Sequence, residues 1–232
     1  MSDGTEVAQR LGEVRERIAD AALGSGRDPG TVRLVVVTKE VSLEGIREAI
    51  DAGATDLGEN RAQELAAKMQ ALAGVASHRW HFIGTLQRNK VKLVTGRVAL
   101  IHGVDSIELG QAISQRAASE GVVQDVLVEV NVSGEASKHG VDPPEAWALV
   151  ASLAGLPGIR LKGLMTIAPP GSGVASRAAF SGLRELRDRL QGELGGGTLD
   201  ELSMGMTSDF EVAVEEGATI VRVGTAIFGP RR

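Results

Sequence analysis

The sequence predicts an α/β protein: a single (β/α)8 barrel of the TIM type with an additional helix at its N-terminus. Three observations support this prediction. Short apolar runs alternate with amphipathic stretches, which is typical of a parallel sheet. Eight such runs occur, enough for a closed barrel. The 232 residues suit one barrel and leave no linker, so we expect one domain over residues 1–232. An open doubly wound sheet is the alternative.

The elements follow one another in regular order. Residues 1–30 contain the N-terminal helix and its lead-in. The predicted strands are Arg33–Lys39, Asp56–Asn60, His81–Gly84, Leu100–Val104, Val126–Asn131, Leu161–Ile167, Glu201–Met206 and Ile220–Gly224. The predicted helices are Leu43–Ala52, Arg61–Leu72, Ser106–Ser119, Pro144–Ala154, Ser176–Leu190 and Asp209–Glu216. Gly53 and Gly217 stand between a helix and the next strand, where glycine accepts the left-handed conformation of a helix end.

Composition narrows the class of protein. The formal charge is −5, and no run of Lys or Arg suggests binding to nucleic acid or to an anionic membrane. The chain has no cysteine, which excludes disulfides and metal sites of the cysteine type. The N-terminus lacks the apolar core of a signal peptide, and no apolar run is long enough to span a bilayer. We expect a cytoplasmic protein.

Lys39 is the first candidate site residue. It follows the apolar run Leu34–Val37 and shares a strand face with Val35 and Val37. An ammonium there is costly unless it is paired or used, and a neutral amine is what Schiff-base chemistry requires. The structural alternative is a lysine whose stem is buried while its head reaches solvent.

Arg222 is the second candidate, because it interrupts the run Ile220–Val223. A guanidinium in such a run indicates a planar acceptor or an anion. A buried pair with Glu129 or with another carboxylate that lines the barrel is the equal alternative.

Two segments fit a phosphate site: Ser203–Asp209 and Gly224–Phe228 follow the predicted seventh and eighth strands, where barrels of this type bind phosphate. Gly205 and Gly224 permit close approach of the backbone, while Ser203 and Thr225 add hydroxyl donors. A lysine nucleophile, an arginine and a phosphate site suit pyridoxal 5′-phosphate (PLP), or a Schiff-base lyase acting on a phosphorylated substrate.

Longer motifs carry a family resemblance. They include Val37-Thr38-Lys39, Gly58-Glu59-Asn60, Trp80-His81-Phe82-Ile83-Gly84, Ser137-Lys138-His139-Gly140, Ser203-Met204-Gly205-Met206 and Val221-Arg222-Val223-Gly224-Thr225. With them the chain resembles, from Arg33 to Gly229, the YggS/PROSC family of pyridoxal-phosphate-binding proteins. The resemblance implies PLP fold type III: a barrel related to the N-terminal domain of bacterial alanine racemase, with PLP as a Schiff base (internal aldimine) on Lys39.

The resemblance also implies the roles of the other site residues. Arg222 would face the pyridine nitrogen, and Asn60 and His81 would line the ring side. The phosphate would be held by Ser203, Gly224 and Thr225, with Met204, Gly205 and Met206 nearby. Departures from the family pattern are Thr38 and Thr207, which keep a hydroxyl, and Arg61, which replaces an aromatic residue at the rim.

The implied function is PLP homeostasis, as a carrier or regulator without strong dedicated catalysis. An amino-acid racemase is the first alternative, but the chain has neither a Tyr nor a Cys to act as second base. A Schiff-base lyase and a cofactor-free structural barrel are the others. PLP-dependent apo-enzymes are the expected recipients, and the loss of a racemase second domain favours a monomer.

The remaining motifs receive simpler interpretations. Lys138 is a candidate for handing PLP to recipient enzymes, and a solvated loop lysine is the alternative. His78, His102 and His139 show no metal-ligand spacing and are expected at the surface or in turns.

Overall fold

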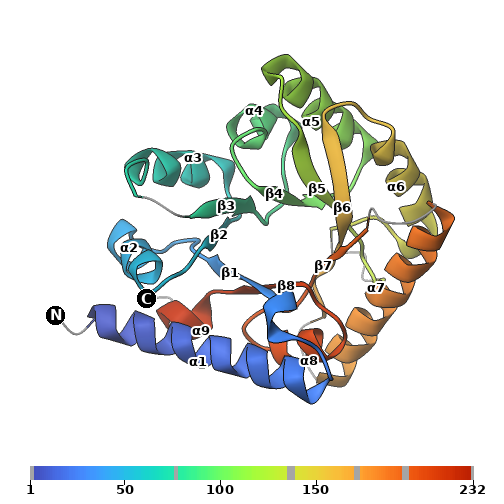
Figure 1. Cartoon of the computed structure of the whole chain (residues 1–232). Coiled ribbons are helices and arrows are strands. Elements are labelled where there is room, and N and C mark those ends of the chain that lie inside the picture. The colour runs from blue at the N-terminus through green and yellow to red at the C-terminus, as the bar shows by residue number, and fades with distance from the viewer. Residues whose placement is uncertain (1–2, 76–77, 135–138, 170–172, 195–198, 231–232) are drawn as a thin grey trace.

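In the computed structural model, the strands close a parallel barrel in which each strand pairs with the next in sequence and β8 pairs with β1 (Figure 1). The structure describes residues 3–75, 78–134, 139–169, 173–194 and 199–230. The strands are β1 Arg33–Val37, β2 Asp56–Glu59, β3 Arg79–Phe82, β4 Leu100–Val104, β5 Gln124–Glu129, β6 Ile159–Met165, β7 Glu201–Ser203 and β8 Ile220–Val223. The predicted barrel is therefore confirmed.

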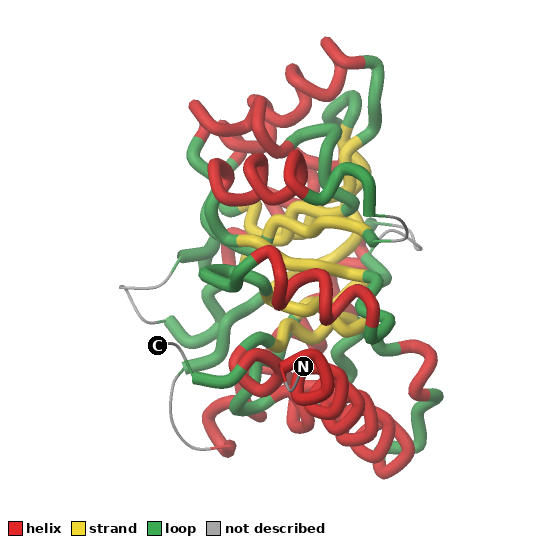
Figure 2. The backbone as a smooth tube through the Cα atoms, turned by 90° about the vertical axis from the view of Figure 1, so that its left-hand side faces the viewer, coloured by secondary structure: helices red, strands yellow, loops and turns green. Residues whose placement is uncertain are grey.

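Helices surround the barrel on its outside (Figures 1 and 2). They are α1 Asp3–Gly24, α2 Leu43–Asp51, α3 Ala62–Ala71, α4 Val91–Val94, α5 Ile107–Glu120, α6 Ala146–Ala154, α7 Gly173–Glu193, α8 Phe210–Glu215 and α9 Thr225–Phe228. The predicted N-terminal helix is α1, which packs against α2, α8 and α9. It buries an apolar stripe of Leu11, Val14 and Ile18 at helical spacing.

Two hydrophobic cores show which way each strand residue faces. The larger core lies between strands and helices and includes Val36, Leu57 and Val221. The smaller one fills the barrel interior and consists of Val35, Leu100, Leu127, Met165 and Ile220, with Ile83 beside it. Because side chains alternate along a strand, residues an even number of positions from an interior residue also point inward. Arg222 on β8 thus faces the interior.

The predicted strands extend too far at several C-terminal ends. The fold places Lys39 in a turn after Val37, and Glu40 next to it has a φ of 62°. Strand β7 stops at Ser203 because Gly205 turns the chain with a φ of +92°. A Cβ at Gly205 would lie 2.5 Å from Ala213 Cβ, so only glycine fits this turn against α8. These loops are where site residues project.

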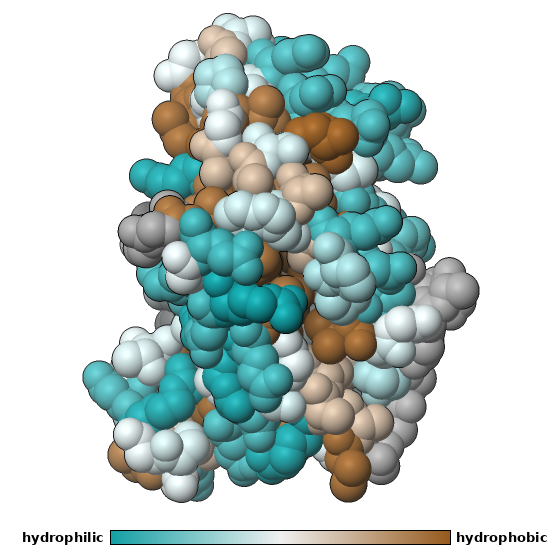
Figure 3. Space-filling view, turned by 90° about the vertical axis from the view of Figure 1, so that its right-hand side faces the viewer, coloured by the Kyte–Doolittle hydropathy of each residue, from teal (hydrophilic) through white to brown (hydrophobic). Residues whose placement is uncertain are grey.

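On the side shown in Figure 3, hydrophilic side chains predominate and hydrophobic ones are interspersed. Exposed large apolar side chains include Trp147 on α6 and Val174 on α7. Within the described residues, none of the helices combines the length and apolar character needed to cross a membrane.

Candidate functional site

The C-terminal ends of β1 and β8 bring the two main candidate residues to one region of the barrel. Strands β1 and β8 are direct neighbours, with Val35 paired to Arg222. Lys39 lies four residues beyond Val35 along the chain and is half-buried. Among the residues that the structure describes, no hydrogen bond or ion pair engages its amine. This leaves Lys39 Nζ available as a nucleophile.

A buried clamp fixes the backbone immediately before Lys39. Thr38 Oγ1 donates to Glu59 Oε1 at 2.7 Å. Lys68 Nζ, from α3, donates to Glu59 Oε1 at 2.7 Å, to Thr38 O at 2.7 Å and to Glu64 Oε1 at 2.6 Å. Glu59 points toward α3 and away from the barrel interior, and burial raises its pKa although Lys68 and Thr38 oppose this. Glu59 therefore supports the turn that carries Lys39.

Arg222 is almost fully buried in the barrel. It donates to Ser203 Oγ at 2.6 Å and to Thr166 O at 3.0 Å. Burial lowers the pKa of Arg222 to about 10, which still leaves it cationic at neutral pH. The alternative pairing with Glu129 is not formed as a hydrogen bond, since Glu129 acts on Arg222 only through its charge. Burial also raises the pKa of Glu129.

The segments after β7 and β8 lie side by side. Ala226 N donates to Thr207 Oγ1 at 3.4 Å, which joins the two segments. Met204 turns its side chain into the outer core, and its N–H donates to Ile220 O at 3.1 Å. Met206 N donates to Asp209 Oδ1 at 2.7 Å.

Small residues let these segments approach the end of β1. Gly224 is so close to β1 that a Cβ would lie 3.0 Å from Val37 O. Thr225, the first residue of α9, is exposed at the rim. The sequence-predicted phosphate segments are thus adjacent to each other and to the Lys39 turn.

Asn60 and His81, both expected on the ring side, lie at different depths. Asn60 follows the end of β2 and is half-buried at the rim. Gly84 packs on it so closely that a Cβ would lie 2.3 Å from Asn60 O. His81 lies on β3 inside the barrel, where it is 1% exposed. Both of its ring nitrogens form hydrogen bonds to other buried side chains.

A line of buried polar side chains runs through the barrel below Arg222. His102 Nδ1 lies 2.8 Å from Ser203 Oγ, and His102 Nε2 lies 3.0 Å from His81 Nδ1. His81 Nε2 lies 2.8 Å from Asp56 Oδ1. The interpretation of His102 as a surface or turn residue is wrong, since it is fully buried on β4. Its position in an apolar strand, the signal used for Arg222, would have revealed it.

The pKa shifts show which members of this line carry a charge. Burial alone would raise the pKa of Asp56, but hydrogen bonds from His81, Arg79 and Thr55 hold it well below its usual range. Burial lowers the pKa of both His81 and His102. The line therefore combines a carboxylate with neutral imidazoles. Within the described residues, no group of three or more acidic or histidine side chains is arranged to hold a metal ion.

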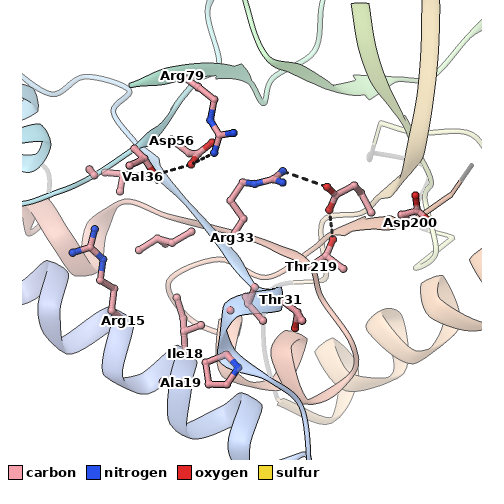
Figure 4. Close-up of a pocket in the computed structure, with 17 residues that line it drawn as sticks. Arg15, Ile18, Ala19, Thr31, Arg33, Val36, Asp56, Arg79, Asp200 and Thr219 are labelled. Carbon is pink, nitrogen blue, oxygen red and sulfur yellow. Dashed lines mark hydrogen bonds and ion pairs between the residues drawn. The ribbon is translucent and has the colours of Figure 1, made fainter. Parts of the chain in front are cut away.

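A cavity lies at the other end of the barrel. It has a volume of about 540 Å³ and lies at the N-terminal ends of the strands, next to α1 (Figure 4). Arg33, Arg79, Asp56 and Glu201 line it. Arg79 pairs with Asp56, and Arg33 points to Glu201 (Figure 4). Active sites of this fold lie at the C-terminal ends, so we do not assign the candidate cofactor site to this cavity.

Lys138 lies outside the described residues, as do residues 135–137 before it. His78 is half-buried before β3, and His139 is exposed beyond β5.

Known proteins resemble the chain over nearly its whole length. The family model for the N-terminal domain of alanine racemase matches residues 20–232. A pyridoxal phosphate homeostasis protein of Aquifex aeolicus is 47% identical over 225 residues, covering 97% of this chain and 98% of that protein.

Two solved structures share the fold at high similarity. A protein of unknown function from Bifidobacterium adolescentis has a TM-score of 0.92 and 43% identity, covering 98% of this chain and 96% of that one. PipY of Synechococcus elongatus, solved with PLP bound, has a TM-score of 0.85 and 35% identity, covering 96% of this chain and 100% of that one.

Proposed function

The chain belongs to the alanine racemase N-terminal domain family and, within it, to the pyridoxal phosphate homeostasis proteins, and on this premise we propose that it binds PLP. PLP is held as a Schiff base on Lys39. The protein acts in PLP homeostasis as a carrier or regulator, without strong dedicated catalysis.

The observation that carries this proposal is the placement of Lys39 and Arg222 toward the C-terminal ends of the neighbouring strands β1 and β8. Lys39 offers an amine without a protein partner among the described residues. Arg222 has five N–H donors, and its hydrogen bonds to Ser203 and Thr166 use two of them. The remaining donors suit an acceptor such as the PLP ring nitrogen. A structural barrel would not need either group.

The phosphate of PLP fits the segments after β7 and β8. Among the described residues, the N–H groups of Gly205 and Thr225 have no acceptor, and backbone N–H groups of this kind bind phosphate. Gly224 keeps this backbone close to the Lys39 turn. We assign Ser203 a place behind Arg222, because its hydroxyl already bonds to Arg222 and His102. Met204 and Met206 position the segment, while Asn60 and His81 belong to the ring side and the interior beneath it.

The same residues argue against strong catalysis. PLP, when bound, supplies an aldehyde that reacts with amines and a pyridine ring that accepts electrons. Arg222 remains cationic at neutral pH and only donates hydrogen bonds, so it disfavours a proton on the ring nitrogen. A ring without that proton is a weaker electron acceptor. We therefore expect slow turnover of amino acids at most.

A labelling experiment tests the cofactor site. The purified protein would be incubated with PLP, reduced with borohydride and mapped by peptide mass spectrometry. We expect a pyridoxyl label on Lys39, and its loss in Lys39→Ala. Lys92→Ala, a lysine on the short helix α4, is the matched control and should keep the label on Lys39. A label distributed over several lysines, with equal uptake in Lys39→Ala, would end the proposal.

Delivery and assembly complete the proposal. The loaded protein gives PLP to PLP-dependent apo-enzymes, works in the cytoplasm and is a monomer. Activation of an apo-enzyme by the loaded protein, faster than by the same total PLP with Lys39→Ala, would support delivery. Sedimentation velocity would test the monomer, and a stable dimer at micromolar concentration would contradict it.

A further inference from the structure

The buried line below Arg222 consists of Ser203, His102, His81 and Asp56, and each contact in it is a hydrogen bond. These side chains come from β7, β4, β3 and β2 and meet inside the barrel. The line starts at the candidate cofactor site. It ends at Asp56, which lines the cavity at the opposite end of the barrel.

With both imidazoles neutral, the chemistry of the end members fixes the direction of every hydrogen bond. A carboxylate at Asp56 only accepts, so His81 Nε2 must donate to it. A neutral His81 then accepts at Nδ1, and His102 Nε2 must donate to it. His102 in turn accepts at Nδ1, so the Ser203 hydroxyl donates to His102. Only the lone pairs of Ser203 Oγ then remain, and they accept from Arg222.

A cationic ring would change this order. A cationic His81 would donate from Nδ1 to His102 Nε2, and His102 would donate from Nδ1 to Ser203. The Ser203 hydroxyl would then lose its acceptor in this line. Burial lowers the pKa of both histidines, and Arg222 and Arg33 lower that of His102 further through their charges. The neutral arrangement is therefore the favoured one.

We propose that Asp56, His81 and His102 are positioning residues for the cofactor site. In this chain of hydrogen bonds Ser203 donates to His102, His102 to His81 and His81 to Asp56. Ser203 Oγ is thereby held as an acceptor and orients the Arg222 guanidinium. The inference rests on the proposed function, because it assigns the line a purpose at the PLP site. The inference extends the cofactor site by residues that reach the opposite end of the barrel, where Asp56 lies.

The geometry explains why such support is needed. An arginine side chain has many rotamers, and its fixation costs conformational entropy. Within the described part of the chain, Arg222 forms no hydrogen bond to a carboxylate and donates to Ser203 Oγ and Thr166 O. If Ser203 instead turned its hydroxyl hydrogen toward Arg222, two donors would face each other. The acceptor at His102 Nδ1 prevents this.

The first experiment reads the hydrogen-bond directions without PLP. Two-dimensional 15N NMR of the imidazole rings in PLP-free protein at pH 7 identifies the tautomer of each histidine. We expect both His81 and His102 to be neutral with the proton on Nε2. A proton on Nδ1 of either ring, or a cationic ring, would overturn the proposed order. This result stands even if the protein does not bind PLP, so it is separate from failure of the proposed function.

The second experiment tests the positioning role by PLP affinity. His102→Phe removes both hydrogen bonds of the ring, and we expect PLP to bind about tenfold more weakly. His102→Gln keeps an acceptor for Ser203 and a donor for His81, so its affinity should stay within about threefold of wild type. His78→Phe, outside the line, is the control and should bind as wild type does.

The possible outcomes distinguish failure of the positioning role from failure of the proposed function. If folded His102→Phe binds PLP as tightly as wild type, the positioning role is wrong. If His102→Phe does not fold, the histidine tautomers of the wild type and the PLP affinity of His102→Gln test the positioning role. A tenfold loss of PLP affinity in folded His102→Gln would overturn it. If wild type binds no PLP, the proposed function fails, while the NMR result still decides the order of the line.

Discussion

Replacing Lys68 with methionine would leave Glu59 buried without its cation. Methionine keeps the aliphatic length of lysine but removes three hydrogen bonds, to Thr38 O, Glu59 and Glu64. Glu59 is fully buried, and its second oxygen, Oε2, has no partner among the described residues. Breaking a buried ion pair from one side is strongly destabilising, because an uncompensated charge remains. We expect Glu59 to take up a proton in the folded Lys68→Met protein.

The magnitude follows from linkage between protonation and folding. Glu59 has an ordinary pKa of about 4.3 in the unfolded chain, so holding it protonated at pH 7 costs about 3.7 kcal/mol, and at pH 5 about 1 kcal/mol. The pKa of Glu59 is already raised in the wild type, so part of this cost is present there. We therefore expect Lys68→Met to lower the free energy of unfolding by about 2–4 kcal/mol at pH 7 and by about 1 kcal/mol or less at pH 5.

The sign can be checked directly. A carboxyl whose folded pKa is raised contributes stability below its unfolded pKa, and this stability is lost as the pH rises through the folded pKa. Urea unfolding of wild type, Lys68→Met and the double variant Glu59→Gln/Lys68→Met at several pH values measures the effect. The double variant should lose the pH dependence. A loss of stability in Lys68→Met that is the same at pH 5 and pH 7 would refute the reasoning.

Three further predictions concern other parts of the molecule. Because the pKa of His102 is lowered, its stabilising contribution is present above its ordinary pKa of about 6.5 and is lost as the pH falls, by about 1.4 kcal/mol between pH 7.5 and 5.5. The stability gap between wild type and His102→Phe should shrink by that amount in urea unfolding, and parallel curves would contradict a neutral buried ring. Gly163→Ala should destabilise by about 3 kcal/mol or more, because its Cβ would lie 1.9 Å from Glu201 O, whereas Gly12→Ala on α1 meets nothing and should stabilise by about 0.5–1 kcal/mol. Equal melting temperatures for these two variants would show that the close contact at β7 is relieved cheaply. PLP at a hundred times its Kd should stabilise wild type by about 2.7 kcal/mol in thermal unfolding, and an equal gain in Lys39→Ala would argue against the Schiff base.

Much of the fold could be predicted because its causes are local. Apolar runs of strand length alternate with amphipathic helical patterns, and this order along the chain dictates a parallel barrel. The ends of the strands were predicted less well. Met204 and Met206 continue the apolar pattern after β7 has ended. The sequence does not show this end, because the turn at Gly205 depends on packing against α8.

Some residues of the candidate site could likewise be predicted from the sequence, and others only from the fold. Arg222 stands out in the sequence because a charge within an apolar strand is costly wherever the strand packs, and Lys39 stands out because it follows an apolar run directly. Glu59 does not, because only the fold decides that it faces Lys68 on α3 and not the barrel interior. His102 also lies within an apolar strand, but only the fold decides which groups surround its two ring nitrogens.

The sequence by itself thus determined the barrel, the position of the lysine and the arginine at its C-terminal end, and the family resemblance. Only the tertiary structure decided which side chains stand behind them: the clamp of Glu59 and Lys68 under Thr38, and the line from Asp56 through His81, His102 and Ser203 to Arg222. The physical reason is that strand patterns arise from neighbours in sequence, whereas hydrogen bonds inside a closed barrel join residues from strands that only closure brings together.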